Sequence, residues 1–362
     1  MQIMKAKRRI AGVAVALASV AGLAACTTVG GSSSAAGGPS GGKSAYLAPA
    51  KKGPYKVGLA NSFAGNTWRS QMVAELKYAV SAKYKSQVSS LTVTDANNDV
   101  STQLSQINDM LSQGVNILLI DAASATALNP AIQRAWSQGV QVVTFDNTTT
   151  SPHAINVGED QTKIGQIGGQ WLASKLKKGD SVFTLDGAAG TPVNSQRLQG
   201  ATAALKSAGI NIVGSANTDW DFAKSQSAAA NLISAHPNVN GIYSQGGDSS
   251  LGAIKALQQR GQKIPPIPGE ASNGFLKEWQ QLHKSQGFTS IAFSSPPELS
   301  VEALDYGIQA LEGKNPVQNP SLPIPVITQS NLSQYVRPDL SDSLWVPTML
   351  PESKLKQLYG NK

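Results

Sequence analysis

Residues 116–121 read NILLID, and this stretch decides the fold class. Four consecutive apolar residues closed by a carboxylate are typical of a strand that is buried on both faces of a parallel sheet. A helical pattern follows over residues 128–138, and a second apolar strand, QVVTF, occupies residues 141–145. Strands that alternate with helices predict an α/β fold, because the crossover helices cover both faces of the sheet.

The same alternation continues along the chain and restarts after Asp146. Two successive runs of this kind predict two doubly wound lobes with parallel sheets. We expect the chain to cross between the lobes near residues 146–147, 270–295 and 322–329, so that these crossings together form a hinge. The remaining predicted strands are residues 56–60, 90–95, 181–185, 210–215 and 241–244, and the remaining predicted helices are residues 68–81, 100–113, 162–175, 196–207 and 222–235.

The start of the chain has the organisation of an export signal. Basic residues between positions 5 and 9 precede an uncharged run over residues 10–25, and LAAC at residues 23–26 closes it. The run is shorter than the roughly 20 apolar residues of a spanning helix, so residues 1–25 are predicted to be a secretory signal peptide. The surroundings of Cys26, the only cysteine, resemble the lipobox of bacterial lipoproteins, which implies lipidation of Cys26. An ordinary cleavable signal with an incidental cysteine is the alternative.

A composition change follows the signal. Residues 27–44 consist almost entirely of Gly, Ser, Ala and Thr, so residues 26–53 are predicted to form a flexible tether between a lipid anchor and a folded body. The rest of the chain is long enough for two domains. The expected division is a first lobe of residues 54–146 and 296–322 and a second lobe, with a C-terminal extension, of residues 147–295 and 323–362.

The net charge does not indicate a nucleic-acid partner. The formal charge of +8 falls to +4 (8 − 4 = 4) when Lys5, Lys7, Arg8 and Arg9 of the signal are removed. The other basic residues form short pairs rather than the stripe that nucleic-acid binding requires. We therefore expect no nucleic-acid partner. We also expect a monomer that contacts the membrane only through its lipid anchor.

Ligands of doubly wound sheets bind beyond the carboxyl ends of the strands, and the residues at these positions are polar or aromatic. Aromatic faces pack on the C–H face of a sugar ring, while carboxylates, amides and guanidinium groups hydrogen-bond its hydroxyls. The sequence therefore predicts a site for a neutral polyol between the lobes. The candidate ligand-binding residues are Asn61, Phe63, Asn66, Trp68, Arg69, Asp121, Asp146, Asn147, Asn194, Arg197, Trp220, Gln245, Glu270 and Asn273.

Short motifs follow one another along this body: VGLANS at residues 57–62, GNTWR at 65–69, ILLID at 117–121, VVTFD at 142–146, VGED at 157–160, RLQG at 197–200 and GAIKAL at 252–257. In this order they resemble the ribose- and galactofuranose-type sugar-binding proteins of ABC importers, which have the type I periplasmic-binding-protein fold. The resemblance implies that Trp68 and Trp220 stack on the sugar ring. It also implies that Arg69 and Arg197 bind its hydroxyls, and that Asp146 lies at the first hinge crossing.

The resemblance implies an exported solute-binding lipoprotein on the outer face of the cytoplasmic membrane, which captures a small sugar or polyol and delivers it to an ABC-type permease. A sugar co-receptor for a chemotaxis or sensor-kinase system is the alternative, because it uses the same fold and differs only in its partner. Ser124, Gly246 and residues 269–271 depart from the ribose-binding pattern, so the particular sugar is not carried over.

The candidate residues also have a structural interpretation that stays open. A tryptophan can pack in the core, an arginine can be solvated on its helix, and an aspartate can cap the helix that follows it. These alternatives concern Trp68, Trp220, Arg69, Arg197, Asp121 and Asp146. Asp160 directly precedes a helical pattern and is interpreted as a cap. Trp136, Trp171 and Trp279 are expected to lie in the middle of helices and are interpreted as packing residues.

The sequence shows no residue set for catalysis. His153, His236 and His283 have no metal-ligand spacing. GAAG at residues 187–190 lacks the glycine pattern that cradles phosphates, and no Gly-x-Ser-x-Gly motif occurs. We predict a binding protein rather than an enzyme, with no catalytic residue, metal or cofactor.

Overall fold

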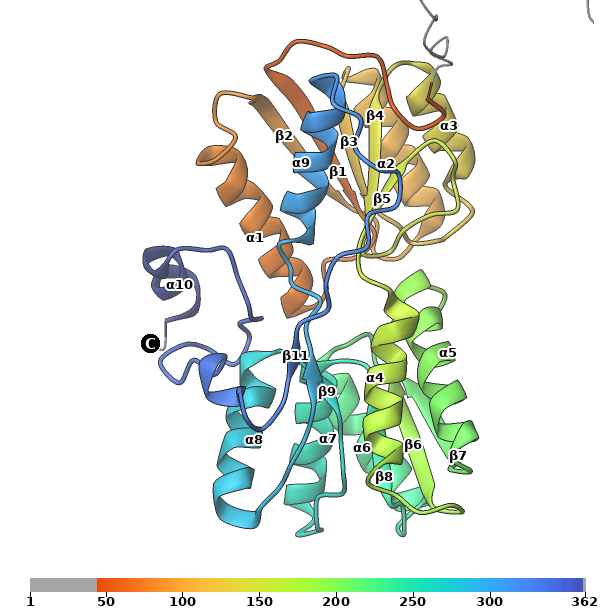
Figure 1. Cartoon of the computed structure of the whole chain (residues 1–362), viewed down its shortest axis with the longest axis vertical. Coiled ribbons are helices and arrows are strands. Elements are labelled where there is room, and N and C mark those ends of the chain that lie inside the picture. The colour runs from red at the N-terminus through yellow and green to blue at the C-terminus, as the bar shows by residue number, and fades with distance from the viewer. Residues whose placement is uncertain (1–43, 361–362) are drawn as a thin grey trace, which may run out of the picture. The chain divides into compact units, whose positions relative to one another are not determined.

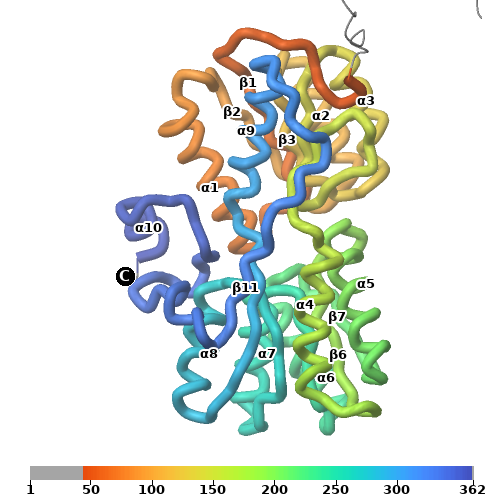
Figure 2. The backbone as a smooth tube through the Cα atoms, in the orientation of Figure 1, coloured from red at the N-terminus to blue at the C-terminus, as the bar shows by residue number. Residues whose placement is uncertain are grey.

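A computed structural model describes residues 44–360 of the chain. The predicted signal peptide, Cys26 and most of the predicted tether lie outside the described residues. Within the described part, no helix is long and apolar enough to cross a membrane. Figures 1 and 2 show two α/β lobes that are joined by several passes of the chain.

The first lobe is built on a parallel sheet with the strand order β2-β1-β3-β4-β5. The strands are β1 (Tyr55–Asn61), β2 (Val88–Asp95), β3 (Ile117–Asp121), β4 (Gln141–Phe145) and β5 (Ile155–Val157), and the helices are α1 (Thr67–Ser81), α2 (Val100–Ser112), α3 (Asn129–Ser137) and α9 (Leu299–Leu311). Helices α1 and α9 cover one face of the sheet, and α2 and α3 cover the other (Figure 1).

Strand β3 shows why the apolar run at its sequence position is continuous. Ile117 and Leu119 pack in the core under α1 and α9. Leu118 and Ile120 pack in the core under α2 and α3. Successive side chains of a strand point to opposite faces, so a strand covered by helices on both sides has no solvent-facing position for a polar residue.

The second lobe contains a parallel sheet with the order β7-β6-β8 and a smaller sheet with the order β11-β10-β9. The strands are β6 (Ser181–Asp186), β7 (Asn211–Asn217), β8 (Gly241–Ser244), β9 (Gly269–Glu270), β10 (Ala292–Phe293) and β11 (Val326–Ile327), and the helices are α4 (Gln161–Ala173), α5 (Pro192–Ser207), α6 (Phe222–Ala235), α7 (Gly247–Gln259) and α8 (Asn273–Gln286). The two sheets are neighbours, because Ile242 N donates to Pro266 O at 3.1 Å. Strand β11 is antiparallel to β10, unlike the wholly parallel sheet that the sequence predicts, because it enters this lobe from the junction.

The chain passes between the lobes at residues 158–160, 294–297 and 322–325 (Figure 2). Strand β5 pairs with β4, so the chain leaves the first sheet after Val157 rather than at Asp146, where the sequence places the boundary. The first and last of these passes run side by side, since Leu322 N donates to Gly158 O at 3.0 Å. A three-residue strand leaves no readable period, which explains the difference.

The beginning of the described chain packs on the first lobe. Ala48 is buried, and its N–H donates to Gln141 Oε1 at 2.9 Å. Gln141 Nε2 donates to Tyr46 O at 3.1 Å. The packed body therefore begins before residue 54, and the last residues of the predicted tether belong to it.

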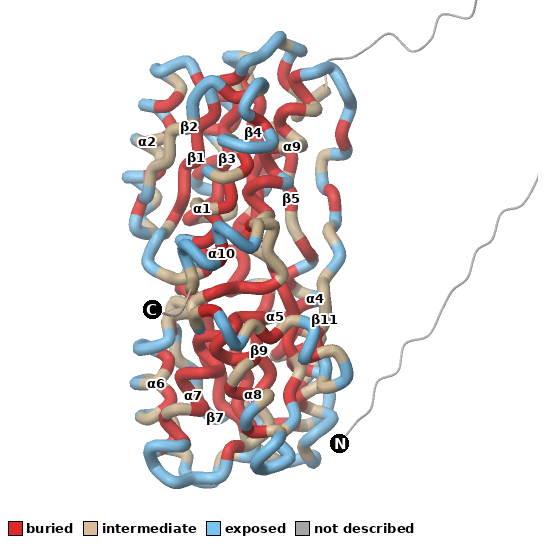
Figure 3. The backbone as a smooth tube through the Cα atoms, turned by 90° about the vertical axis from the view of Figure 1, so that its left-hand side faces the viewer, coloured by how far each residue is buried: buried red, intermediate tan, exposed pale blue. Residues whose placement is uncertain are grey.

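The C-terminal extension, defined here as residues 328–360, contacts both lobes. It contains a short 3-10 helix, η1 (Leu332–Gln334), and α10 (Glu352–Tyr359). Leu344 and Leu355 join the apolar core of the second lobe, whereas Trp345 joins the core of the first lobe. Figure 3 shows α10 at the level of the junction between the lobes.

Candidate ligand-binding site

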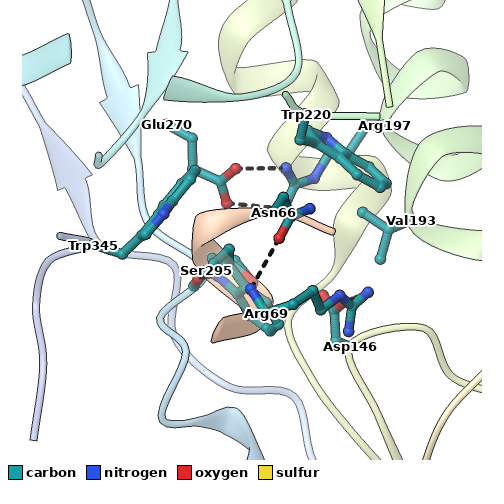
Figure 4. Close-up of a pocket in the computed structure, with 10 residues that line it drawn as sticks. Asn66, Arg69, Asp146, Val193, Arg197, Trp220, Glu270, Ser295 and Trp345 are labelled. Carbon is teal, nitrogen blue, oxygen red and sulfur yellow. Dashed lines mark hydrogen bonds and ion pairs between the residues drawn. The ribbon is translucent and has the colours of Figure 1, made fainter. Parts of the chain in front are cut away.

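A recess, called here the interlobe recess, lies between the lobes at the carboxyl ends of strands from both sheets (Figure 4). It holds about 330 Å³ of space, including space open to solvent. The lining residues are Asn66, Trp68, Arg69, Asp146, Val193, Arg197, Trp220, Glu270, Ser295 and Trp345.

Helix α1 supplies much of the first-lobe side of the recess. Asn66 is its N-cap, and Asn66 Oδ1 accepts a hydrogen bond from Arg69 N at 2.9 Å. This cap starts the helix at the end of β1, so its first turn lies beside the sheet ends. Trp68 is 7% exposed, and its Nε1 donates to Ser295 O at 2.7 Å. Trp68 therefore belongs both to the apolar core and to the wall of the recess.

Arg69 forms a buried ion-pair cluster with two carboxylates. Its Nη2 lies 3.0 Å from Asp146 Oδ2, and its Nη1 pairs with Asp121. Asn147 Nδ2 donates to both carboxylates, at 3.0 Å to Asp121 Oδ1 and at 3.0 Å to Asp146 Oδ2. Helix α3 begins at Asn129, so Asp121 holds Arg69 rather than capping that helix. Asp146 has a φ of 53°, a strained conformation that the surrounding contacts must hold in place.

Arg197 on α5 is the centre of the second-lobe side. Its Nη1 and Nη2 donate to the Glu270 carboxylate at 3.0 and 3.1 Å in a bidentate pair. Its Nε donates to Gln161 Oε1 at 2.8 Å, and Nη1 donates to Gln245 O at 2.8 Å. Burial raises the pKa of Glu270 although Arg197 opposes this effect. These contacts occupy four of the five guanidinium N–H groups within residues 44–360, which leaves one for a ligand.

Close contact between α4 and α5 fixes the backbone under Arg197. A Cβ atom on Gly165 would lie 2.0 Å from Arg197 O, and one on Gly200 would lie 2.1 Å from Thr162 O. The two helix backbones meet at these positions because neither glycine carries a side chain. Gly200 is the last residue of the RLQG motif, so the motif supplies both the arginine and the glycine that allows the close contact between α4 and α5.

Trp220 follows β7 and forms an aromatic wall of the second lobe. Its φ is 55°, and its ring lies so close to Gly187 that a Cβ atom there would approach the ring to 2.0 Å. The indole Nε1 is buried and has no hydrogen-bond partner among the described residues. A buried donor is unfavourable until a bound molecule or water provides an acceptor.

Other candidates support the recess from behind. Asp121 and Asn147 hold Arg69 and Asp146, as described above. Gln245 Nε2 donates to Asn194 Oδ1 at 2.9 Å, and the same oxygen accepts from Gly187 N at 2.9 Å. This pair fixes the loop under the Trp220 ring. The candidate residues that do not line the recess are Asn61, Phe63, Asp121, Asn147, Asn194, Gln245 and Asn273.

Asn61 and Asn273 have local structural roles. Asn61 Nδ2 donates to Phe63 O at 2.7 Å and shapes the loop after β1. Asn273 is the first residue of α8, where its side chain donates to Arg337 O at 2.7 Å and accepts from Arg337 N at 2.9 Å. Asn273 therefore holds the C-terminal extension in place. We propose that it is not one of the ligand-binding residues.

The recess also contains residues that the strand-end argument does not find. Val193 lies in the first turn of α5, which begins at Pro192 rather than at residue 196. Ser295 also lines the recess, and its backbone oxygen accepts from Trp68 Nε1, a contact that no side-chain pattern reveals. Trp345 comes from the C-terminal extension, where the only signal is a tryptophan within the polar stretch SDSLWVPT.

The structural interpretations of other residues are confirmed. Asp160 caps α4, because Asp160 Oδ1 accepts from Lys163 N at 2.9 Å. Trp279 is fully buried in the second-lobe core, and Trp136 stacks on His153 with ring centroids 4.5 Å apart. In the part of the chain that the structure covers, no group of three or more His, Cys, Asp or Glu is placed to hold a metal ion.

The sequence profile of the periplasmic binding protein domain matches residues 57–315, more than half of the chain. The chain belongs to this family. It is 30% identical to the ribose import binding protein of Escherichia coli over 180 residues, which are 49% of this chain and 61% of that protein. It is 26% identical to the ribose import binding protein of Bacillus subtilis over 279 residues, which are 77% of this chain and 88% of that protein. An ABC transporter solute binding protein from Thermobispora bispora is similar in structure, with a TM-score of 0.74 at 25% identity, over 84% of this chain and 94% of that chain.

Family membership confirms the resemblance that the motifs indicate. The similar structure confirms the fold of two α/β lobes. It also confirms that this periplasmic binding protein is a binding protein rather than an enzyme, and it implies a location outside the cytoplasm. The E. coli relative is matched over less than two thirds of its length. The profile ends at residue 315, so the C-terminal extension lies beyond the matched part.

Proposed function

We propose that this periplasmic binding protein captures a small sugar or polyol in the interlobe recess and delivers it to an ABC-type permease. The observation that carries the proposal is the buried indole N–H of Trp220, which lacks an acceptor among the described residues and lies beside the fixed guanidinium groups of Arg69 and Arg197. A hydroxyl group both accepts and donates, so a polyol satisfies these groups while its C–H face packs on an indole. The ribose import binding relatives support the same ligand class.

The charges of the recess favour an uncharged ligand. Arg197 and Glu270 form a bidentate pair whose formal charges cancel. Arg69 faces both Asp121 and Asp146, so that cluster carries a formal charge of −1 (1 − 2 = −1). Both arginines that line the recess are thus compensated, and a phosphate or carboxylate ligand would be repelled rather than neutralised.

Ligand binding is coupled to closure of the lobes. Direct contacts already join them, since Thr67 Oγ1 donates to Asp248 Oδ2 at 2.7 Å and Val193 N donates to Asn147 Oδ1 at 3.0 Å. A solute between Arg69 and the second lobe contacts both sides only in the closed state, and therefore shifts the population toward it. The closed form is the one that the permease recognises.

Export and lipidation at Cys26 complete the proposal. A diacylglycerol on Cys26 would keep the binding protein beside its permease on the outer face of the cytoplasmic membrane. A role as a sugar co-receptor for a signalling system requires the same binding site, so binding alone does not separate the two functions. Uptake of the solute in cells that lack the protein does separate them.

A thermal-shift screen against neutral pentoses, hexoses and polyols, followed by calorimetric titration of each hit, tests the proposal. We expect stabilisation by a small number of these solutes and recovery of each solute unchanged after prolonged incubation. Binding of charged solutes only, with no response to any neutral polyol, would contradict the proposed ligand class. Loss of uptake in the deletion strain supports the importer role, whereas normal uptake with a lost signalling response favours the co-receptor.

A further inference from the structure

The C-terminal extension is tied to the second lobe by backbone hydrogen bonds. Ser272 and Trp345 form an antiparallel β-bridge, and Val346 N donates to Ala271 O at 3.0 Å. Asn273 N donates to Leu344 O at 2.7 Å. Since the bridge follows β9 directly, Trp345 is held in register with the strand that supplies Glu270.

The same tryptophan is tied to the first lobe. Its N–H donates to Gln71 Oε1 at 2.8 Å, and its carbonyl oxygen accepts from Gln71 Nε2 at 2.9 Å. Its Nε1 donates to Thr67 Oγ1 at 2.7 Å. Thr67 in turn donates to Asp248 of the second lobe at 2.7 Å. One hydroxyl group therefore joins the first lobe, the second lobe and the extension.

These contacts place the Trp345 ring in the wall of the interlobe recess, where the residue is 3% exposed. Figure 4 shows Trp345 and Trp220 on opposite sides of the Arg197–Glu270 pair. The ring position is fixed by partners in both lobes, so the wall is complete only when the lobes are closed.

We propose that Trp345 is a specificity-determining ligand contact, supplied by the C-terminal extension, that restricts the recess to small solutes. The inference rests on the proposed solute-binding function and adds the part of the chain that sets solute size. A large, rigid indole fixed by hydrogen bonds cannot move aside for a longer ligand without breaking its contact with Thr67. The fixed ring in its wall accordingly makes the recess a size filter as well as a binding site.

The test compares binding of a graded series of neutral solutes, from tetritols and pentoses to hexitols and disaccharides, to wild-type protein and to Trp345→Ala. We expect affinity for the best small solute to fall at least about tenfold, because a stacking face and its buried area are lost. Affinity for the larger solutes is expected to stay level or rise, so the order of preference changes. Trp345→Phe keeps an aromatic face without the bond to Thr67. Its order of preference among the solutes is expected to lie between those of wild type and Trp345→Ala. This milder variant serves if the alanine variant does not fold.

Two controls separate ligand contact from a structural role. Thr348→Val removes the 2.6 Å bond from Thr348 Oγ1 to Glu75 Oε1, which links the extension to α1 outside the recess. It is expected to lower all affinities by a similar factor and to keep the order of preference. Trp171→Phe replaces a half-buried tryptophan remote from the recess and is expected to leave affinity unchanged.

The outcomes are distinct. If wild-type protein binds no neutral solute of the series, the proposed function fails. If wild-type protein binds and both Trp345 variants keep its order of preference, the size-filter inference fails while the proposed function stands. A uniform loss in the Trp345 variants that matches Thr348→Val also overturns the inference, because it shows that the ring only holds the extension in place.

Discussion

Replacing Arg197 by methionine tests whether the second-lobe side of the recess is a coupled buried ion pair. The substitution keeps an unbranched apolar stem but removes the guanidinium group, which leaves the Glu270 carboxylate, 4% exposed, without its bidentate partner. Breaking one side of a buried pair costs about 3–5 kcal/mol. The free energy of unfolding, measured by urea denaturation at pH 8, should fall by about that amount.

The pH dependence gives the sign of the effect. Burial raises the pKa of Glu270, and Arg197 acts against this rise. Without Arg197 the pKa of Glu270 rises further, so the carboxyl group stays protonated in the folded state to higher pH. Stability from such a raised pKa is present at low pH and lost as the pH increases. The deficit of Arg197→Met should therefore be smaller at pH 5 than at pH 8.

A double variant separates stability from binding. Arg197→Met combined with Glu270→Met removes both charges and should recover most of the lost stability. Gln161 Oε1 and Gln245 O still lack their donor, which leaves a residual loss of about 1–3 kcal/mol. Affinity for the sugar should be lost in both variants. A single variant as stable as wild type, or a double variant no more stable than the single, would refute the reasoning.

Further predictions concern other residues. Trp220→Phe keeps an aromatic face but removes the unpaired indole N–H. Calorimetry should therefore show affinity lowered about tenfold, while the melting temperature of the ligand-free protein does not fall. Unchanged affinity would mean that no ligand atom accepts a hydrogen bond from this N–H. Burial raises the pKa of Glu159 from 4.5 to about 8, so the free energy of unfolding should decrease as the pH rises through this interval. Urea denaturation over a pH series should show a smaller decrease for Glu159→Gln than for wild type. A pH profile identical to that of wild type would show that Glu159 does not cause the decrease. Cys26→Ser should release the protein from membranes, and protein that remains bound after a high-salt wash would argue against lipidation.

Local structure was predictable to a large extent. Strands β4 and β8 and helix α6 begin and end at the predicted residues, because their apolar periods and flanking turns are strong. Helix α5 begins at Pro192, four residues before the predicted start, since proline is favoured in the first helical turn. Strand β5 was not predicted, because three residues carry no period and their pairing with β4 is a tertiary contact.

The candidate site was predictable in part. The rule that ligands bind at strand ends brought Trp68, Arg69, Arg197 and Glu270 together, and the structure places all of them around one recess. The same rule also selected Asn273, which begins α8 and whose side chain donates to Arg337 O, so we propose that it has a structural role instead. A strand-end position limits where a residue lies, but it does not determine which way its side chain points.

The sequence by itself determined the α/β class, the division into two lobes and the chemistry of the residues at the strand ends, because apolar periodicity and residue type are local properties. Only the tertiary structure decided which of these residues share the recess. The pairing of Arg69 with Asp121 and Asp146 joins the ends of separate strands, and the contact of Trp345 with Gln71 joins the C-terminal extension to the first helix. Such contacts depend on how the lobes and the extension pack against one another, and no period in the sequence records a partner that lies hundreds of residues away.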